Sequence, residues 1–226
     1  MIKVLNSWKD LGKSIGLLHK EKSGYHKFDA MKNWDLAQIS KLLSPLEKDI
    51  QILDMGCAGS QALQFCHKKG YKNCIGIDIN IPILDRLRQF LYIFTEREFP
   101  YHLAKIDLMH TSFPNEFFDF IICLSVIEHG VDVEKMLKEC SRLLKSKGIL
   151  FITTDYWEPK IVPKINYKPF DLNWNIFSEN EIKNLVKIAQ KYHLNCENDY
   201  IPPVTDKFIW WSNESYTFIS ITLSKE

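Results

Sequence analysis

The feature that most constrains the fold is a nearly continuous apolar segment at residues 117–124, which reads FFDFIICL. A strand needs apolar side chains in succession only when both of its faces are covered, because a strand with one exposed face alternates apolar and polar residues. Such strands occur in parallel sheets that carry helices on both sides. Even when extended to Ile127, the run contains Asp119 and Ser125 and is shorter than the roughly 20 residues of a membrane span. We therefore predict an α/β protein with a central parallel sheet.

The segments around this strand alternate between strand and helix patterns. Short apolar segments favour strands, and segments with apolar residues three or four apart favour helices. The predicted strands are 50–55, 73–79, 101–106, 117–124 and 149–154, followed later by 194–200 and 215–224. The predicted helices are 30–43, 60–69, a helix that begins near Pro82, 132–144 and 179–192. At 226 residues the chain fits a single domain, 1–226.

Two stretches, 155–177 and 201–213, show neither period and are rich in proline and aromatic residues. Long irregular loops on an α/β core usually carry function. We therefore predict that both stretches are insertions on the substrate side of the sheet. The alternative is that their aromatic side chains are core residues beneath a long loop.

The charge balance and the cysteine pattern argue against several classes of protein. The chain has 29 Lys and Arg against 28 Asp and Glu, a net charge of +1, whereas nucleic-acid binding needs a clustered basic excess. A polybasic membrane anchor is disfavoured for the same reason. The first residues (MIKVLNSWKDLGKS) lack the apolar core of a signal peptide, so we expect a cytoplasmic protein. The six cysteines form no C-x-x-C pair, which predicts reduced thiols and no metal site.

Acidic and small residues stand where the predicted parallel strands end, the edge at which open α/β sheets bind ligands. Residues 54–60 (DMGCAGS) lie at the C-terminal end of the first strand, and small side chains there let a ligand approach the backbone. The segment is not the dinucleotide fingerprint G-x-G-x-x-G, because Ala58 stands at the second glycine. Asp78 ends the second strand, 22 residues after Gly56, close to the spacing at which a carboxylate binds ribose hydroxyls. Asp107 and Leu108 follow the third strand and suit an adenine edge and face.

With these sites in order, the sequence resembles the class I S-adenosylmethionine-dependent methyltransferases, and most closely their small-molecule branch. In that branch the fourth strand reads F-D-x-I-x-x-x-x-V-x-E-H, which here is FDFIICLSVIEH at residues 118–129. The resemblance covers residues 48–156 and, more loosely, the chain to residue 226. It departs from the family at Ala58 and Ser60, where glycines are common, and at Ser146 and Lys147, which replace a proline-glycine turn.

The resemblance implies a Rossmann-like three-layer sandwich with a seven-stranded, mostly parallel sheet in the order 3-2-1-4-5-7-6, whose last strand is antiparallel. It implies S-adenosyl-L-methionine as the cofactor, with Asp78 at the ribose, Asp107 at the adenine and the end of the fourth strand near the sulfonium. It also implies that residues 1–47 form an N-terminal helical lid segment. The residues expected to bind the cofactor are Asp54, Gly56, Cys57, Ala58, Asp78, Ile79, Asp107, Leu108, Leu124 and Ser125.

Two residues on the expected acceptor side are candidates for a general base. His129 follows the fourth strand, and its ordinary pKa suits proton transfer near neutrality. Asp155 stands just past the fifth strand. For His129 the alternative is structural: together with Glu128 it would brace the start of the following helix.

We therefore expect methyl transfer from S-adenosyl-L-methionine to an oxygen or nitrogen of a small molecule or glycan precursor. No N/D-P-P-Y/F motif follows the fourth strand, which argues against methylation of a nucleobase amino group. Aromatic-rich insertions suit a sugar ring or a planar metabolite. The expected partner is a small-molecule acceptor, with no nucleic acid and no membrane, and the oligomeric state stays open. The alternatives are a non-catalytic binding subunit of this fold, an NAD(P)-dependent oxidoreductase, and methylation of a carbon atom.

Overall fold

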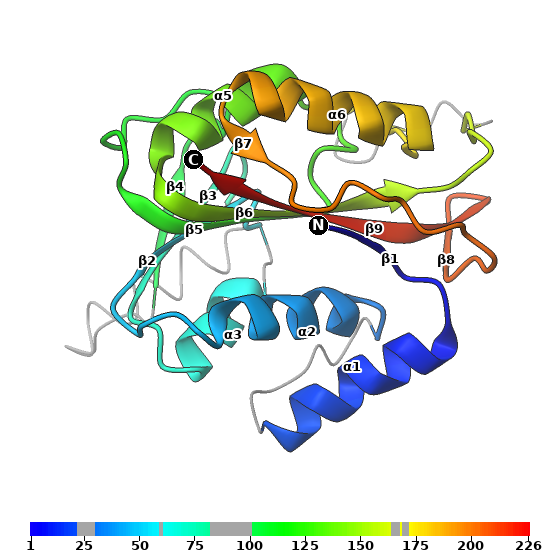
Figure 1. Cartoon of the computed structure of the whole chain (residues 1–226), viewed down its shortest axis with the longest axis horizontal. Helices are drawn as coiled ribbons and strands as arrows, with labels where there is room; N and C mark the ends of the chain where they lie inside the picture. Colours follow the sequence, from blue (N-terminus) through cyan, green and yellow to red (C-terminus); the bar gives the residue numbers. More distant parts are fainter. Residues whose placement is uncertain (22–29, 59–60, 82–100, 164–167, 169–171) are drawn as a thin grey trace.

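The chain is represented by a computed structural model, which describes residues 1–21, 30–58, 61–81, 101–163, 168 and 172–226. A mixed sheet runs through the middle, with α5 and α6 on one side and α1, α2 and α3 on the other (Figure 1). The helices are α1 (Trp8–Lys20), α2 (Lys32–Leu43), α3 (Ala62–Lys68), α5 (Val133–Leu143) and α6 (Glu179–Lys191). The strands are β1 (Ile2–Val4), β2 (Gln51–Met55), β3 (Asn73–Asp78), β4 (His102–Lys105), β5 (Phe118–Leu124), β6 (Leu144–Tyr156), β7 (Leu194–Asn195), β8 (Ile209–Trp211) and β9 (Glu214–Lys225).

The sheet order is β1-β9-β6-β5-β2-β3-β4, with β7 and β8 also paired to β9. The neighbours from β6 to β4 are parallel, and β9 is antiparallel to β6. This confirms the Rossmann-like class and the predicted order of six strands. The strand predicted at 194–200 also pairs with β9, but as β7 it has only two residues. The sequence did not predict β1, which pairs with the middle of β9.

Strand β5 is buried on both faces, as its continuous apolar sequence predicts. Phe120 and Ile122 pack into the core that contains α2 and α3, whereas Ile121 and Cys123 pack into the core that contains α5 and α6. The pairing of β5 with β6 shifts register between Phe118 and Phe120. Because successive side chains of a strand point to opposite faces, alternate residues of β5 fill two separate cores.

Several boundaries differ from the sequence prediction. The expected strand 149–154 is β6, which starts directly after α5 and includes the expected turn at residues 145–148. Lys147 takes the left-handed backbone conformation there, with φ +64°. Helix α6 begins after Ser178, as predicted, because Ser178 and Glu181 form a reciprocal capping box. The predicted helix that begins near Pro82 lies outside the described residues.

The N-terminal region holds two elements that the sequence pattern did not reveal, β1 and α1. Ser7 caps α1 by accepting a hydrogen bond from the Asp10 backbone N–H. Helix α2, predicted within 30–43, packs onto the central strands through Leu36, Ile39 and other apolar residues. Nine of its twelve residues are buried, because α1 covers the side that faces away from the sheet.

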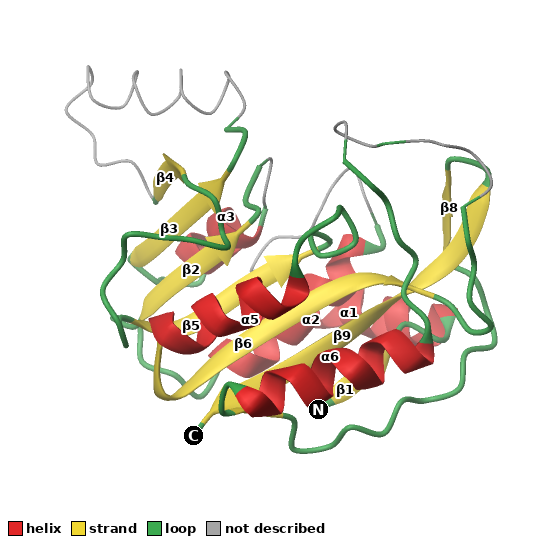
Figure 2. Cartoon of the chain, turned by 90° about the horizontal axis from the view of Figure 1, so that it is seen from above, coloured by secondary structure: helices red, strands yellow, loops and turns green. Residues whose placement is uncertain are grey.

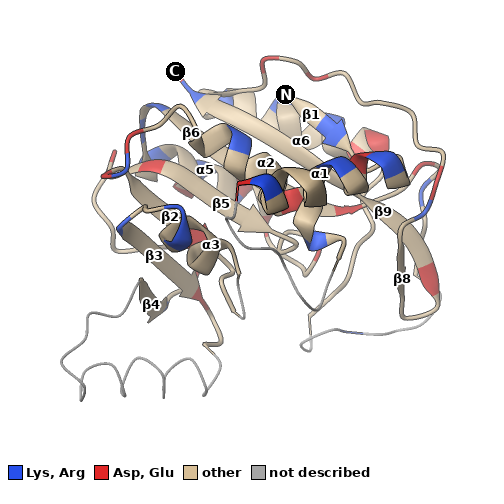
Figure 3. Ribbon diagram, turned by 90° about the horizontal axis from the view of Figure 1, so that it is seen from below, with Lys and Arg blue, Asp and Glu red and all other residues tan. Residues whose placement is uncertain are grey.

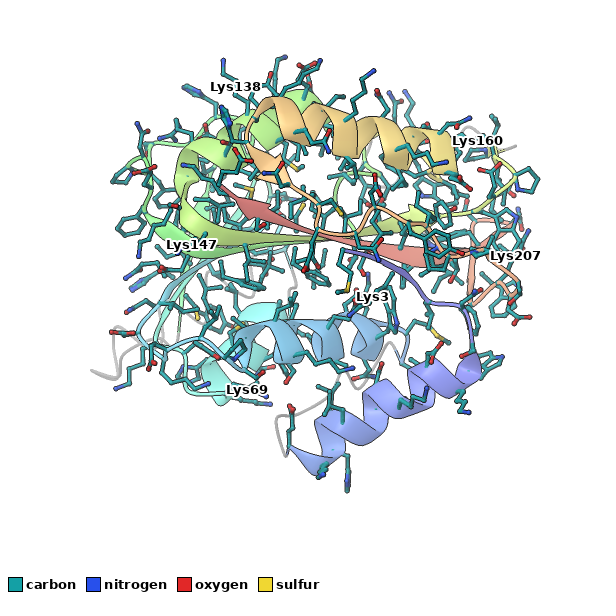
Figure 4. The ribbon with its side chains drawn as sticks, viewed as in Figure 1. Lys3, Lys69, Lys138, Lys147, Lys160 and Lys207 are labelled. Atoms are coloured by element: carbon teal, nitrogen blue, oxygen red, sulfur yellow. The ribbon has the colours of Figure 1, made fainter. Side chains whose placement is uncertain are left out.

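The irregular stretches 155–177 and 201–213 pack together with the N-terminal region at one end of the sheet. Their shared core joins Leu5, Leu11 and Trp34 to Trp174 and Phe208. Within the second stretch, β8 forms a hairpin with β9 that stands at the far end of the sheet (Figure 2). The first stretch is tied to α6 by Lys160, whose ammonium donates to Glu181 Oε2 at 2.6 Å (Figure 4).

Lys and Arg are interspersed with Asp and Glu along the part of the chain that the structure describes (Figure 3). Among the helices of the described ranges, none is both long and apolar enough for a transmembrane segment.

Candidate active site

The candidate site lies where parallel strands β2 to β6 end, and its first component is the turn after β2. Gly56 has φ +76°, a left-handed conformation that costs glycine little because it lacks a Cβ. The backbone N–H groups of Gly56 and Cys57 both donate to the carbonyl oxygen of Ile77, at 2.8 and 3.1 Å. A Cβ built on Gly56 would lie 2.9 Å from Val126 Cγ1 and closer still to its Cγ2. The turn therefore needs glycine both for its backbone angle and for its contact with the loop after β5.

Asp78, at the end of β3, anchors this turn. Its Oδ2 accepts a hydrogen bond from the Ala58 N–H at 3.0 Å, and its Oδ1 accepts one from the Asn80 N–H at 2.8 Å. Each carboxylate oxygen has two lone pairs, so these bonds leave Asp78 capacity to accept from ligand hydroxyls. Ile79, the next residue, is 52% exposed. The structure thus brings Asp78 and Ala58 together and gives Asp78 an anchoring role that its spacing from Gly56 did not indicate.

The other two predicted carboxylates differ in their surroundings. Asp54 lies within β2 and is 1% exposed. Asp107 lies just after β4, where its Oδ1 accepts from the Met109 N–H at 2.9 Å and its carbonyl accepts from the His110 N–H at 3.1 Å. Leu108 is 8% exposed and packs into the larger core. Because β2, β3 and β4 are parallel neighbours, these residues share one sheet edge with Asp78.

The end of β5 is held from two directions. Ser125 follows Leu124 with φ +51°, and its N–H donates to the Thr153 carbonyl on β6 at 2.9 Å. Its hydroxyl accepts a hydrogen bond from the ammonium of Lys32, the first residue of α2. The same ammonium lies 3.2 Å from Asp35 Oδ2. Sequence reasoning missed Lys32, because a lysine in the first turn of an amphipathic helix carries no signal that distinguishes it from a solvated one.

Two buried carboxyl groups lie near this lysine. Glu128 Oε2 accepts from the Thr154 hydroxyl at 2.9 Å, and Asp155 Oδ2 accepts from the Trp174 indole N–H at 2.8 Å. Burial raises the pKa of Asp155 to about 6. Burial, and then the charge of Asp155, raise the pKa of Glu128 well above its ordinary value. Burial lowers the pKa of Lys32, but the neighbouring carboxylates outweigh it and the net pKa is raised.

His129 lies in the loop after β5, beside Trp211 of β8. The centres of its ring and of the Trp211 ring are 6.4 Å apart, and the two rings meet edge to face. Burial, and then the positive charge of Lys32, lower the pKa of His129, so its imidazole is neutral at neutral pH and able to take a proton. Asp132, whose side chain accepts from the Lys135 N–H, caps the following helix α5. Neither Glu128 nor His129 is therefore the cap of that helix.

Comparison with known proteins shows which family this part of the chain matches. Residues 53–152 match the family model described as "Methyltransferase domain". The fold is also that of a SAM-dependent methyltransferase from Methanosarcina mazei, with a TM-score of 0.60 and 18% identity over 82% of this chain and 96% of that one. Residues 53–152 therefore carry a methyltransferase domain, on the fold of the class I S-adenosylmethionine-dependent methyltransferases. The sequence resemblance stated above is thereby confirmed.

Two relatives show how far the similarity reaches. A tRNA U34 carboxymethyltransferase of Helicobacter pylori (strain HPAG1) is 30% identical over 130 residues, 57% of this chain and 48% of that protein. A ubiquinone biosynthesis O-methyltransferase of Neisseria meningitidis serogroup A is 24% identical over 110 residues, 49% of this chain and 46% of that protein. The matches thus span about half the length of these relatives, and the two names describe different kinds of acceptor.

Proposed function

We propose that this methyltransferase domain binds S-adenosyl-L-methionine and transfers its methyl group to an oxygen or nitrogen of a small-molecule or glycan-precursor acceptor. The observation that carries the proposal is the turn at residues 56–58, which is anchored on Asp78 at the end of β3. In this turn, backbone without large side chains lies beside a carboxylate that can accept further hydrogen bonds. Both lie within residues 53–152, which match the methyltransferase family model. Such an arrangement suits an adenosyl ligand that lies across the strand ends.

The described residues fit this cofactor. The turn has no side chain at Gly56 that could keep a ligand from its backbone, and Ile79 offers an exposed apolar surface next to Asp78. Asp78 would hold the ribose hydroxyls, Asp107 and Leu108 the adenine, and the turn with Asp54 and Ser125 the methionyl end. When bound, the cofactor supplies an already activated methyl group on a positively charged sulfur. The protein then contributes by aligning the reactants and excluding water. Such positioning lowers the activation free energy by about 7 kcal/mol in favourable cases.

A hydroxyl acceptor also needs a group that takes its proton. We propose His129 for this role, because its lowered pKa keeps the imidazole neutral and its ring lies beside Trp211 of β8. A well-placed base contributes about 10²–10⁴-fold in rate. Asp155 is the second candidate, with a pKa of about 6, but it is 3% exposed and already bound to Trp174. A nitrogen acceptor that arrives as a neutral amine would need neither residue during transfer.

Two observations support the proposed acceptor class: the balance of charges and the aromatic residues of the irregular stretches. A net charge of +1 and interspersed charges favour a small molecule over a polynucleotide. Trp211, beside His129, packs edge to face on Trp174 with ring centres 5.2 Å apart, and such aromatic residues suit a planar or sugar acceptor. The tRNA-modifying relative makes tRNA the second candidate acceptor.

The binding step is tested by calorimetry with S-adenosylhomocysteine. The wild-type chain is expected to bind it, and Asp78→Ala to weaken binding about ten- to hundredfold, since hydrogen bonds to a charged group contribute about 1.5–3 kcal/mol. Asp49→Ala is the matched control, because Asp49 is an exposed carboxylate that precedes β2 at the opposite sheet edge. No binding by the wild type at millimolar ligand, or equal binding by Asp78→Ala, would contradict the proposal.

The acceptor is tested by incubating the protein with methyl-labelled S-adenosyl-L-methionine and either a fractionated metabolite extract or total tRNA. We expect label in a small-molecule fraction, and label in tRNA would favour the second acceptor. A parallel NADH fluorescence titration separates this function from that of an oxidoreductase. Binding of S-adenosylhomocysteine without label in any fraction would favour a non-catalytic binding subunit.

A further inference from the structure

Lys32 joins three parts of the fold at the edge of the proposed site. Its side chain is 19% exposed, and its ammonium lies 3.2 Å from Asp35 Oδ2 on the same helix. The same ammonium donates to the Ser125 hydroxyl after β5 and lies 4.1 Å from the centre of the Phe218 ring on β9. One side chain of α2 thus contacts both the loop after β5 and the last strand.

The charges around Lys32 keep it an ammonium. Asp35 is 0% exposed, and the buried carboxyl groups of Glu128 and Asp155 also act on the charge of Lys32. Asp35 also accepts from the Thr153 hydroxyl at 3.4 Å. The ammonium of Lys32 therefore has several partners, the Asp35 carboxylate, the Ser125 hydroxyl and the Phe218 ring, which together fix its position.

The contact of Lys32 with Ser125 is linked through Val126 to the turn at residues 56–58, which we call the cofactor turn. Ser125 holds a left-handed backbone, φ +51°, which only surrounding contacts maintain in a residue other than glycine. The next residue, Val126, packs directly against Gly56, where a Cβ would leave no room for it. The placement of Ser125 therefore sets how the loop after β5 packs against the turn after β2.

We propose that Lys32 is a positioning residue of the methyl-transfer site: through the Ser125 hydroxyl, it fixes the loop after β5 against the cofactor turn at Gly56. This inference rests on the proposed function, because the turn at Gly56 is the cofactor turn only if the domain binds S-adenosyl-L-methionine. It assigns α2, a helix outside the family match at residues 53–152, a direct part in organising the site.

The test is a double-mutant cycle with S-adenosylhomocysteine as the probe. Lys32→Met and Ser125→Ala are each expected to weaken its binding about tenfold, the scale of one hydrogen bond to a charged group. The double variant should bind no more weakly than the weaker single variant, because both changes remove the same contact. Lys32→Arg should recover most of the affinity. Lys41→Met, an exposed lysine at the other end of α2, should leave it unchanged.

Three results overturn the proposal. One is unchanged affinity in a Lys32→Met variant whose thermal unfolding is cooperative, and another is losses that add in the double variant. If Lys32→Met does not fold, Ser125→Ala decides alone, and unchanged affinity in that variant refutes the role of the contact. Absence of binding by the wild type is a separate result, which refutes the proposed function itself.

Discussion

Replacement of Gly56 by alanine tests the geometry of the cofactor turn. The left-handed backbone at this residue, φ +76°, costs a residue with a Cβ about 1–2 kcal/mol. The added methyl group would lie 2.9 Å from Val126 Cγ1 and closer to Cγ2, and overpacking of this kind costs about 1–3 kcal/mol. Gly56→Ala should therefore lower the free energy of unfolding by about 2–5 kcal/mol.

The two contributions can be separated by shortening Val126. In the Gly56→Ala background, Val126→Ala removes the steric part and leaves the backbone part, so a coupling of about 1–3 kcal/mol is expected between the two substitutions. Urea unfolding measures each free energy, and S-adenosylhomocysteine titration follows the site. The matched control is Gly12→Ala in α1, where a Cβ meets nothing within 4 Å. That change should stabilise the chain by up to about 1 kcal/mol.

The reasoning fails if Gly56→Ala changes the free energy of unfolding by less than about 1 kcal/mol, or if the effects of Gly56→Ala and Val126→Ala simply add. The first result would mean that the turn tolerates a side chain, and the second that Val126 yields without cost. A loss of ligand affinity at unchanged stability would instead place the Gly56 requirement in the ligand contact.

Two further predictions concern stability. Ser178→Ala removes the capping box of α6 and should lower the free energy of unfolding by about 1 kcal/mol in urea; an unchanged midpoint would show that the cap is dispensable. The raised pKa of Asp155, about 6, means that the folded state holds a proton which the unfolded state releases near pH 4. Its contribution, up to about 3 kcal/mol, is present below pH 4 and lost as the pH rises through 6. Asp155→Asn should flatten this slope, and an identical slope in wild type and variant would refute the assignment.

Much of the site followed from the sequence because its residues stand at strand ends. The turn after β2, Asp78 and Asp107 occupy equivalent places after parallel neighbours, so the strand pattern alone predicted that they share an edge. The bond from Ala58 to Asp78 was not foreseen. Spacing indicates that a carboxylate is near the turn, but only coordinates show which backbone group it binds.

The position of α2 shows where sequence reasoning stopped. Its period predicted a helix, but nothing in the period showed which way Lys32 and Asp35 face. Their partners, Ser125 and Thr153, are far along the chain and lie on two other strand ends. A hydrogen bond between such segments depends on the packing of α2 over the sheet, which local pattern does not encode.

The sequence by itself determined the alternation of strands and helices and the residue types at the strand ends, and its resemblance to a known family implied the order of the central strands. The alternation follows from local periods of two and 3.6. Tertiary structure alone decided that a three-residue strand, β1, pairs with β9, which begins more than 200 residues later, and that Lys32 lies among three buried carboxyl groups. Contacts between segments so distant in sequence depend on the packing of the whole core, because no short segment holds both partners.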